Sequence, residues 1–102
     1  MAIDKVYTVS EIGSIVAPIA REYGVNRLSL FGSYARGDAT QGSDIDLRLI
    51  DKGEIRGLFK LSGFQLALQD SLGVNVDVLP TDALSDDFLG RIAGEEVVIY
   101  ER

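Results

Sequence analysis

Two aspartates, Asp44 and Asp46, stand one residue apart within the apolar segment Ser43-Asp44-Ile45-Asp46-Leu47. Alternate side chains of an extended strand share a face, so both carboxylates are expected on the same side of a sheet. Carboxylates held that close repel each other unless a cation lies between them. Mg²⁺ typically takes one or two protein carboxylates together with the phosphate oxygens of a substrate. The pair therefore predicts a metal site; the alternative is that the two charges only protect a sheet edge against aggregation.

A Gly-Ser turn, Gly32-Ser33, precedes the aspartates by ten residues and follows a strand-like run at Arg27–Phe31. Small residues allow a phosphate chain to approach the backbone amides closely. Ser33 could equally cap a short helical turn, which is compatible with phosphate binding. The guanidinium of Arg36 suits a phosphate oxygen, or it could pair with Asp38 on the surface. With the two carboxylates, the turn predicts a site for a metal–nucleotide complex.

The order of these motifs resembles that of the nucleotidyltransferases of the DNA polymerase β superfamily. The forms Gly-Ser-Tyr-Ala-Arg-Gly and Ser-Asp-Ile-Asp-Leu are most similar to the minimal nucleotidyltransferases, the MNT antitoxins of MNT–HEPN toxin–antitoxin pairs. The resemblance covers most of the chain and includes a third acidic segment, Val76-Asp77-Val78. It implies that Asp44, Asp46 and Asp77 bind two Mg²⁺ ions. It also implies that Gly32 and Ser33 hold the phosphates of ATP, with Arg36 as a further candidate.

The same resemblance implies a reaction and a partner. AMP would pass from ATP to a hydroxyl, expected to be a tyrosine, of a HEPN-type toxin, which is thereby inactivated. Asp77 would bind the ion at the attacking hydroxyl or accept its proton. Two alternatives stay open: an antitoxin that only masks its toxin, and a nucleotidyltransferase acting on a small molecule such as an aminoglycoside. The presence of all three carboxylates and of the Gly-Ser pair favours the enzyme.

Length and composition limit the other possibilities. The chain has 102 residues, 46% of them hydrophobic, which predicts one domain over residues 1–102. About a hundred residues leave little room for an acceptor-binding domain, so the acceptor is expected to be bound by this core, a homo-oligomer or a partner protein. The absence of cysteine and histidine excludes disulfides and a Ser-His triad and disfavours zinc. A net charge of −6 argues against stable nucleic-acid binding by this chain alone. No signal-peptide pattern or run of membrane-spanning length is present, so a cytoplasmic protein is expected.

Hydrophobic periodicity predicts the order helix, strand, strand, helix, strand, helix, strand. The first helix starts at a capping box, Thr8 to Glu11, contains Pro18, which should bend it, and stops at Gly24. The later helices are expected over 54–72 and from Ser85 to Gly94, and the strands over 27–31, 44–50, 75–79 and 97–100. The predicted fold is α/β (α+β): a small mixed sheet flanked by helices, a nucleotidyltransferase core with one carboxylate-bearing face left open.

The helix over 54–72 carries apolar residues on two sides. Its main stripe is expected to face the core and consists of Leu58, Leu61, Phe64, Leu68 and Leu72. A smaller stripe, Phe59, Gly63 and Leu66, is either a partner surface or packs against the C-terminal helix. We favour packing against the C-terminal helix at this point.

Overall fold

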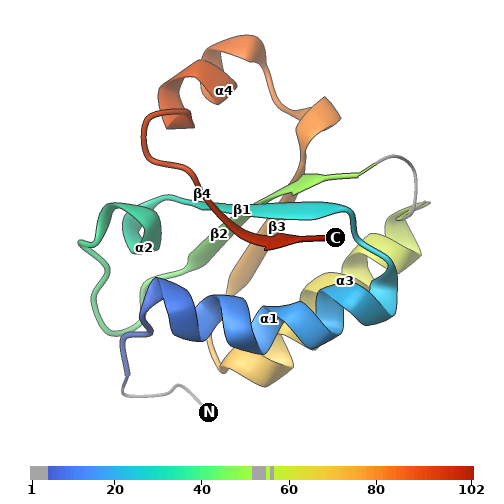
Figure 1. The fold of residues 1–102 in the computed structure, drawn as a ribbon, viewed down its shortest axis with the longest axis horizontal. Coiled ribbons are helices and arrows are strands. Elements are labelled where there is room, and N and C mark those ends of the chain that lie inside the picture. The colour runs from blue at the N-terminus through green and yellow to red at the C-terminus, as the bar shows by residue number, and fades with distance from the viewer. Residues whose placement is uncertain (1–4, 52–54, 56) are drawn as a thin grey trace.

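A four-stranded mixed sheet with helices on both faces forms the molecule (Figure 1). The computed structural model describes residues 5–51, 55 and 57–102. In chain order the elements are α1 (Val9–Tyr23), β1 (Arg27–Phe31), α2 (Ser33–Arg36), β2 (Ile45–Ile50), α3 (Gly57–Leu72), β3 (Val76–Pro80), the 3₁₀ turn η1 (Thr81–Ala83), α4 (Asp86–Ile92) and β4 (Val97–Glu101). The predicted fold class and element order are confirmed, with η1 and the short α2 as additions.

The strand order is β3-β2-β1-β4. β1 lies antiparallel to both β2 and β4, whereas β2 and β3 are parallel, because α3 carries the chain across the sheet between them. Helices α1 and α3 lie side by side under one face, and α4 lies on the other side of the sheet (Figure 1). Within the described residues, no helix has the length and apolarity that crossing a membrane requires.

The core lies between the sheet and the pair α1 and α3. Alternation places Leu28, Leu30, Ile45, Leu47 and Val76 on this face, where all five are buried. The helices contribute Ile12, Val16 and Ala20 from α1 and Phe64, Leu68 and Leu72 from α3. The residues of opposite parity in β2 and β3 must then point to the other face, which α4 covers only in part. This leaves the predicted carboxylate-bearing face open.

The start of α1 agrees with the sequence pattern. The Thr8 hydroxyl accepts the N–H of Glu11, and the Glu11 carboxylate accepts the N–H of Thr8, which completes the predicted capping box. Pro18 lies inside α1, which continues on both sides of it. The helix ends before Gly24, whose φ of 72° is the left-handed conformation common at helix C-termini.

Helix α3 agrees with the predicted main stripe at Phe64, Leu68 and Leu72, which are buried, and departs from the prediction at Leu58 and in the smaller stripe. Leu58, expected in the buried stripe, is 77% exposed, because the first turn of α3 lies beside the rim of the sheet. Phe59 and Leu66 are 97% and 58% exposed, so their favoured packing against the C-terminal helix is wrong: α4 lies across the sheet (Figure 1). Gly63 faces Tyr23 of α1. The predicted start of this helix at Glu54 falls outside the described residues.

The remaining boundaries shift by one or two residues. β2 begins at Ile45, so Asp44 immediately precedes it, and β3 runs one residue later than predicted, to Pro80. Ser85 caps α4 by accepting the N–H of Phe88, as predicted, but the helix ends at Ile92 before it reaches Gly94. These shifts leave the parity of each strand unchanged, so the faces of the sheet are as expected.

Candidate active site

Two of the predicted carboxylates lie directly opposite each other on neighbouring strands. The parallel register of β2 and β3 pairs Asp46 with Asp77. Both have the parity opposite to the buried residues of their strands, so their side chains share the open face of the sheet. Asp44, two residues before Asp46, stands at the entrance to β2. The structure thus places Asp46 and Asp77 side by side, with Asp44 near enough for its charge to act on Asp46.

The electrostatics of Asp46 reflect this convergence. Partial burial raises the pKa of its carboxyl from the usual 3.8 to about 6, and the negative charges of Asp77 and Asp44 add to the rise. The Arg36 guanidinium lowers the pKa of Asp46 and the Glu95 carboxylate raises it, both more weakly. Asp46 therefore lies in an excess of negative charge that a bound cation would relieve.

Gly32 passes unusually close to Asp46. Its φ of 80° lies in the region that favours glycine, and a Cβ built on Gly32 would overlap Oδ2 of Asp46. The glycine at the end of β1 therefore allows the Gly-Ser turn to lie against the carboxylates. The turn itself differs from one expectation: Gly32 is the N-cap of α2 and Ser33 its first helical residue, so Ser33 does not cap this helix.

Arg36, at the end of α2, contacts two acids. Its Nε lies 3.2 Å from Oδ2 of Asp38, the surface pair that the sequence suggested. Its Nη1 also lies 3.4 Å from both carboxylate oxygens of Glu95, and Oε2 of Glu95 accepts the N–H of Gly32 at 2.5 Å. The backbone amide and the guanidinium that the sequence assigned to phosphate thus converge on one anion.

A second polar cluster lies further along the same face of β2. The Nε and Nη2 atoms of Arg48 donate to the two carboxylate oxygens of Glu96, at 2.6 and 3.0 Å, in a bidentate pair with both side chains largely buried. Nη1 of Arg48 approaches the Thr81 hydroxyl at 3.4 Å, and that hydroxyl donates to the Leu49 carbonyl at 2.8 Å. This cluster is charge-balanced and ties the turn between α4 and β4 to β2 and η1.

The carboxylate set suits Mg²⁺ by its chemistry. All three side chains offer hard oxygen ligands, and the negative charges of Asp77 and Asp44 add to the burial that raises the pKa of Asp46. No group of three or more acidic side chains in the described part of the chain is already gathered tightly enough to enclose an ion. Mg²⁺ completes its coordination with phosphate oxygens and water, so two protein carboxylates are sufficient for the fit.

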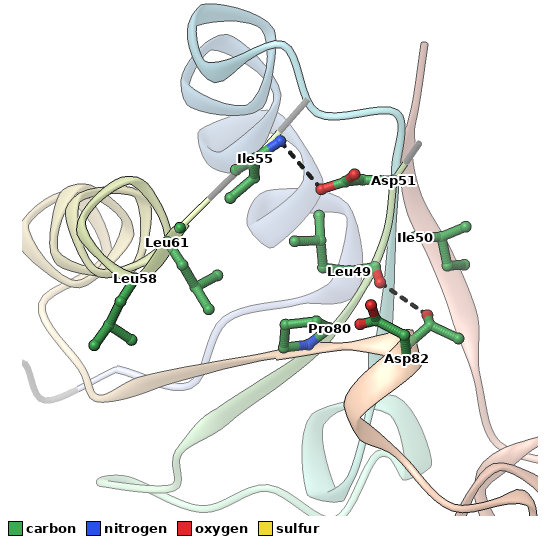
Figure 2. A pocket seen from close by; sticks show the side chains of 10 residues that line it. Leu49, Ile50, Asp51, Ile55, Leu58, Leu61, Pro80 and Asp82 are labelled. Carbon is green, nitrogen blue, oxygen red and sulfur yellow. Dashed lines mark hydrogen bonds between the residues drawn. The ribbon is translucent and has the colours of Figure 1, made fainter. Parts of the chain in front are cut away.

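A separate pocket lies away from the carboxylate-bearing face. A cavity of about 570 Å³ opens at the far ends of β2 and β3, with Leu49, Leu61 and Pro80 among its apolar walls and Asp51 and Asp82 as acidic groups (Figure 2). Its described lining residues include two acids and no arginine or lysine, so these residues offer no positive charge to balance a triphosphate. The open face beside Gly32 and Asp46 is therefore the better candidate for nucleotide chemistry.

Sequence reasoning missed Glu95 and the pair Arg48–Glu96. Glu95 lies 63 residues from Gly32 along the chain, in the turn between α4 and β4. No local pattern predicts such a contact. Arg48 has the same parity in β2 as Asp46, and this alternation is the one signal in the sequence for the second cluster.

Comparison with known proteins agrees with this geometry. Residues 14–100 match the model of the nucleotidyltransferase domain family. A candidate protein adenylyltransferase of Methanocaldococcus jannaschii is 38% identical over 89 residues, covering 87% of this chain and 95% of that protein. The protein adenylyltransferase MntA of Thermococcus cleftensis is 33% identical over 96 residues, covering 90% of this chain and 96% of MntA.

Solved structures share the fold. A toxin–antitoxin crystal structure with AMP-PNP superposes with a TM-score of 0.75 at 17% identity, covering 88% of this chain and 73% of that one. The complex of a tri-AMPylated Shewanella oneidensis HEPN toxin with an MNT antitoxin gives 0.70 at 14% identity, covering 93% and 74%. The predicted resemblance to minimal nucleotidyltransferases is confirmed, and with residues 14–100 matched the chain belongs to the nucleotidyltransferase domain family.

Proposed function

We propose that this protein transfers AMP from ATP to a hydroxyl group of a HEPN-type toxin and acts as its antitoxin. The observation that carries the proposal is the convergence of Asp44, Asp46 and Asp77 on an open sheet face directly beside the Gly32–Ser33 turn. The names of the relatives support a protein acceptor, and the AMPylated toxin in a structural neighbour supports the HEPN class.

The Gly32–Ser33 turn and Arg36 would hold the triphosphate. Both the Gly32 amide and the Arg36 guanidinium already point to one anionic group, so their directions suit phosphate oxygens. The Ser33 hydroxyl, next in the chain, would supply a further donor. Because Gly32 lies against Asp46, a phosphate bound at the turn would lie next to the carboxylates.

The chemistry is a displacement at phosphorus. The oxygen of the acceptor hydroxyl attacks the α-phosphorus of ATP, the bond from that phosphorus to the bridging oxygen breaks, and pyrophosphate leaves with that electron pair. Asp77, opposite Asp46 in the register, would lie on the acceptor side and take the hydroxyl proton. Asp44 and Asp46 would bind Mg²⁺, with Asp77 as a third ligand. Two such ions supply activation of the attacking oxygen and neutralisation of the charge on the leaving pyrophosphate.

The acceptor is expected to be a tyrosine of the toxin. A folded partner can contribute contacts away from the reacting hydroxyl, and these contacts position it for attack. Free tyrosine and short peptides should accordingly be poor acceptors. Because the donor is the ATP of the cell interior, we also place the protein in the cytoplasm.

Intact-mass analysis tests this function. The protein would be incubated with Mg²⁺, ATP and its cognate HEPN protein, and the HEPN protein should gain the mass of one or more AMP groups. Asp46→Asn should lower the rate by roughly 100- to 1000-fold, since it removes charge stabilisation specific to the reaction. Arg27→Met, which alters an exposed ion pair with Glu101, is the control and should leave the rate unchanged. An unmodified toxin that is nevertheless neutralised would establish masking, the alternative function.

A further inference from the structure

The side chain of Glu95 occupies the groups that would hold phosphate. Its Oε2 atom accepts the Gly32 N–H at 2.5 Å, and both of its oxygens lie 3.4 Å from Nη1 of Arg36. The Glu95 side chain is 21% exposed, whereas Asp38, the other acid on Arg36, is 62% exposed. Glu95 is therefore the inner of the two carboxylates and the one that reaches the turn.

The backbone around Glu95 is anchored on both sides. The N–H groups of Glu95 and Glu96 both donate to the Ile92 carbonyl at 3.0 Å, which closes the last turn of α4. The Glu96 side chain is held by the bidentate pair with Arg48, and β4 begins directly afterwards. The backbone of Glu95 is thus held close to Gly32. Rotation of the Glu95 side chain alone would free the Gly32 N–H, with the backbone in place.

A phosphate and the Glu95 carboxylate would exclude each other at this position. Each needs the same Gly32 N–H, and two anions brought together on one donor repel. We propose that Glu95 is an internal competitor for the phosphate-binding turn, which occupies the turn in the free protein and must be displaced when the triphosphate binds. This inference rests on the function proposed above.

Competition of this kind lowers the apparent affinity for nucleotide. The observed dissociation constant equals the intrinsic one divided by the fraction of molecules whose turn is free. Removing the competitor raises that fraction to one. By contrast, a Glu95 that merely organised the Gly32 turn or oriented Arg36 would make binding tighter by its presence, so the two roles predict opposite changes.

Calorimetric titration with two probes, Mg²⁺–ATP and inorganic tripolyphosphate, separates these roles. Glu95→Ala should bind both probes about three- to tenfold more tightly than wild type. Glu95→Gln should give a smaller gain, because its amide oxygen can still accept the Gly32 N–H but carries no charge. Asp38→Asn is the matched control: it removes one negative charge from the same arginine without vacating the Gly32 N–H. It should change the dissociation constants by less than about twofold.

Unchanged or weaker binding by both Glu95 variants, with circular dichroism showing that they fold, would overturn the inference. Equal tightening by Asp38→Asn would overturn it too, since net charge would then explain the gain. In both cases wild-type binding of Mg²⁺–ATP leaves the proposed function standing. Failure of wild type and every variant to bind either probe would contradict the proposed function and, with it, the role of Glu95.

Discussion

Two polar clusters share the open face of the sheet and differ in how their charges are balanced. In the cluster of Arg48, Glu96 and Thr81, every charge faces a partner, and the bidentate pair joins the turn between α4 and β4 to β2. In the cluster of Asp46 and Asp77, two carboxylates face each other across parallel strands. Both occupy the solvent-side parity of β2, two residues apart. The balanced cluster leaves no charge unpaired, and the unbalanced one holds a repulsion between carboxylates that a bound cation would relieve.

Breaking the balanced cluster should have the largest effect on stability. Arg48→Met leaves the Glu96 carboxylate largely buried without its partner, which should lower the free energy of unfolding by about 2–4 kcal/mol. Urea denaturation measures the change. Adding Glu96→Leu to Arg48→Met should recover most of the lost free energy of unfolding, because two apolar side chains leave no buried charge.

The exposed pair Arg27–Glu101 is the matched control for that experiment. Its atoms are 3.3 Å apart, but its side chains are 41% and 61% exposed. Arg27→Met should therefore change the free energy of unfolding by less than about 0.5 kcal/mol. A similar loss for both arginine variants would show that burial does not distinguish the two pairs.

Removing a charge from the unbalanced cluster should change the free energy of unfolding in the opposite direction. Asp46→Asn should raise the stability of the free protein at neutral pH, because it removes a carboxylate whose pKa is raised from 3.8 to about 6. That shift would correspond to about 3 kcal/mol, but the side chain is only half-buried, so solvent screening should reduce the gain to about 1 kcal/mol.

The gain from Asp46→Asn should depend on pH. The folded wild type binds the Asp46 proton more tightly than the unfolded chain does, so its stability falls as pH rises from 3.8 through about 6. The advantage of Asn should vanish below pH 3.8 and be complete above the folded pKa. Denaturation curves across this range measure it, and a constant difference at every pH would contradict the electrostatic cause.

Tyr34 tests the same comparison with a buried polar group that carries no charge. Its buried hydroxyl lacks a hydrogen-bond partner within the described residues. Tyr34→Phe should thus leave the free energy of unfolding unchanged or raise it by about 0.5 kcal/mol. Tyr7→Phe is the control: its hydroxyl donates to the Leu72 carbonyl at 2.6 Å, so that variant should lose about 1 kcal/mol. Equal losses in the two variants would indicate that the Tyr34 hydroxyl has a partner.

The sequence predicted the parts of this molecule that follow local periodicity. Alternation in 45–49 and 76–78 correctly assigned Asp46 and Asp77 to one face, because parity depends only on strand geometry. Periodicity also assigned Phe64 of α3 to the core, but it could not show that Phe59 and Leu66 are left uncovered, since the position of α4 is set by the whole fold. The approach of Glu95 to Gly32 depends on how α4 crosses the sheet, which is a property of the whole fold.

Thermal melting of wild type and Asp46→Asn, each with and without Mg²⁺–ATP, tests the central claim most directly. A ligand that binds only the folded state raises its melting temperature by mass action. If the unbalanced carboxylates form the metal–nucleotide site, Mg²⁺–ATP should raise the melting temperature of the wild type by several degrees and that of Asp46→Asn much less. Equal shifts in the two proteins, or no shift in the wild type, would contradict the assignment.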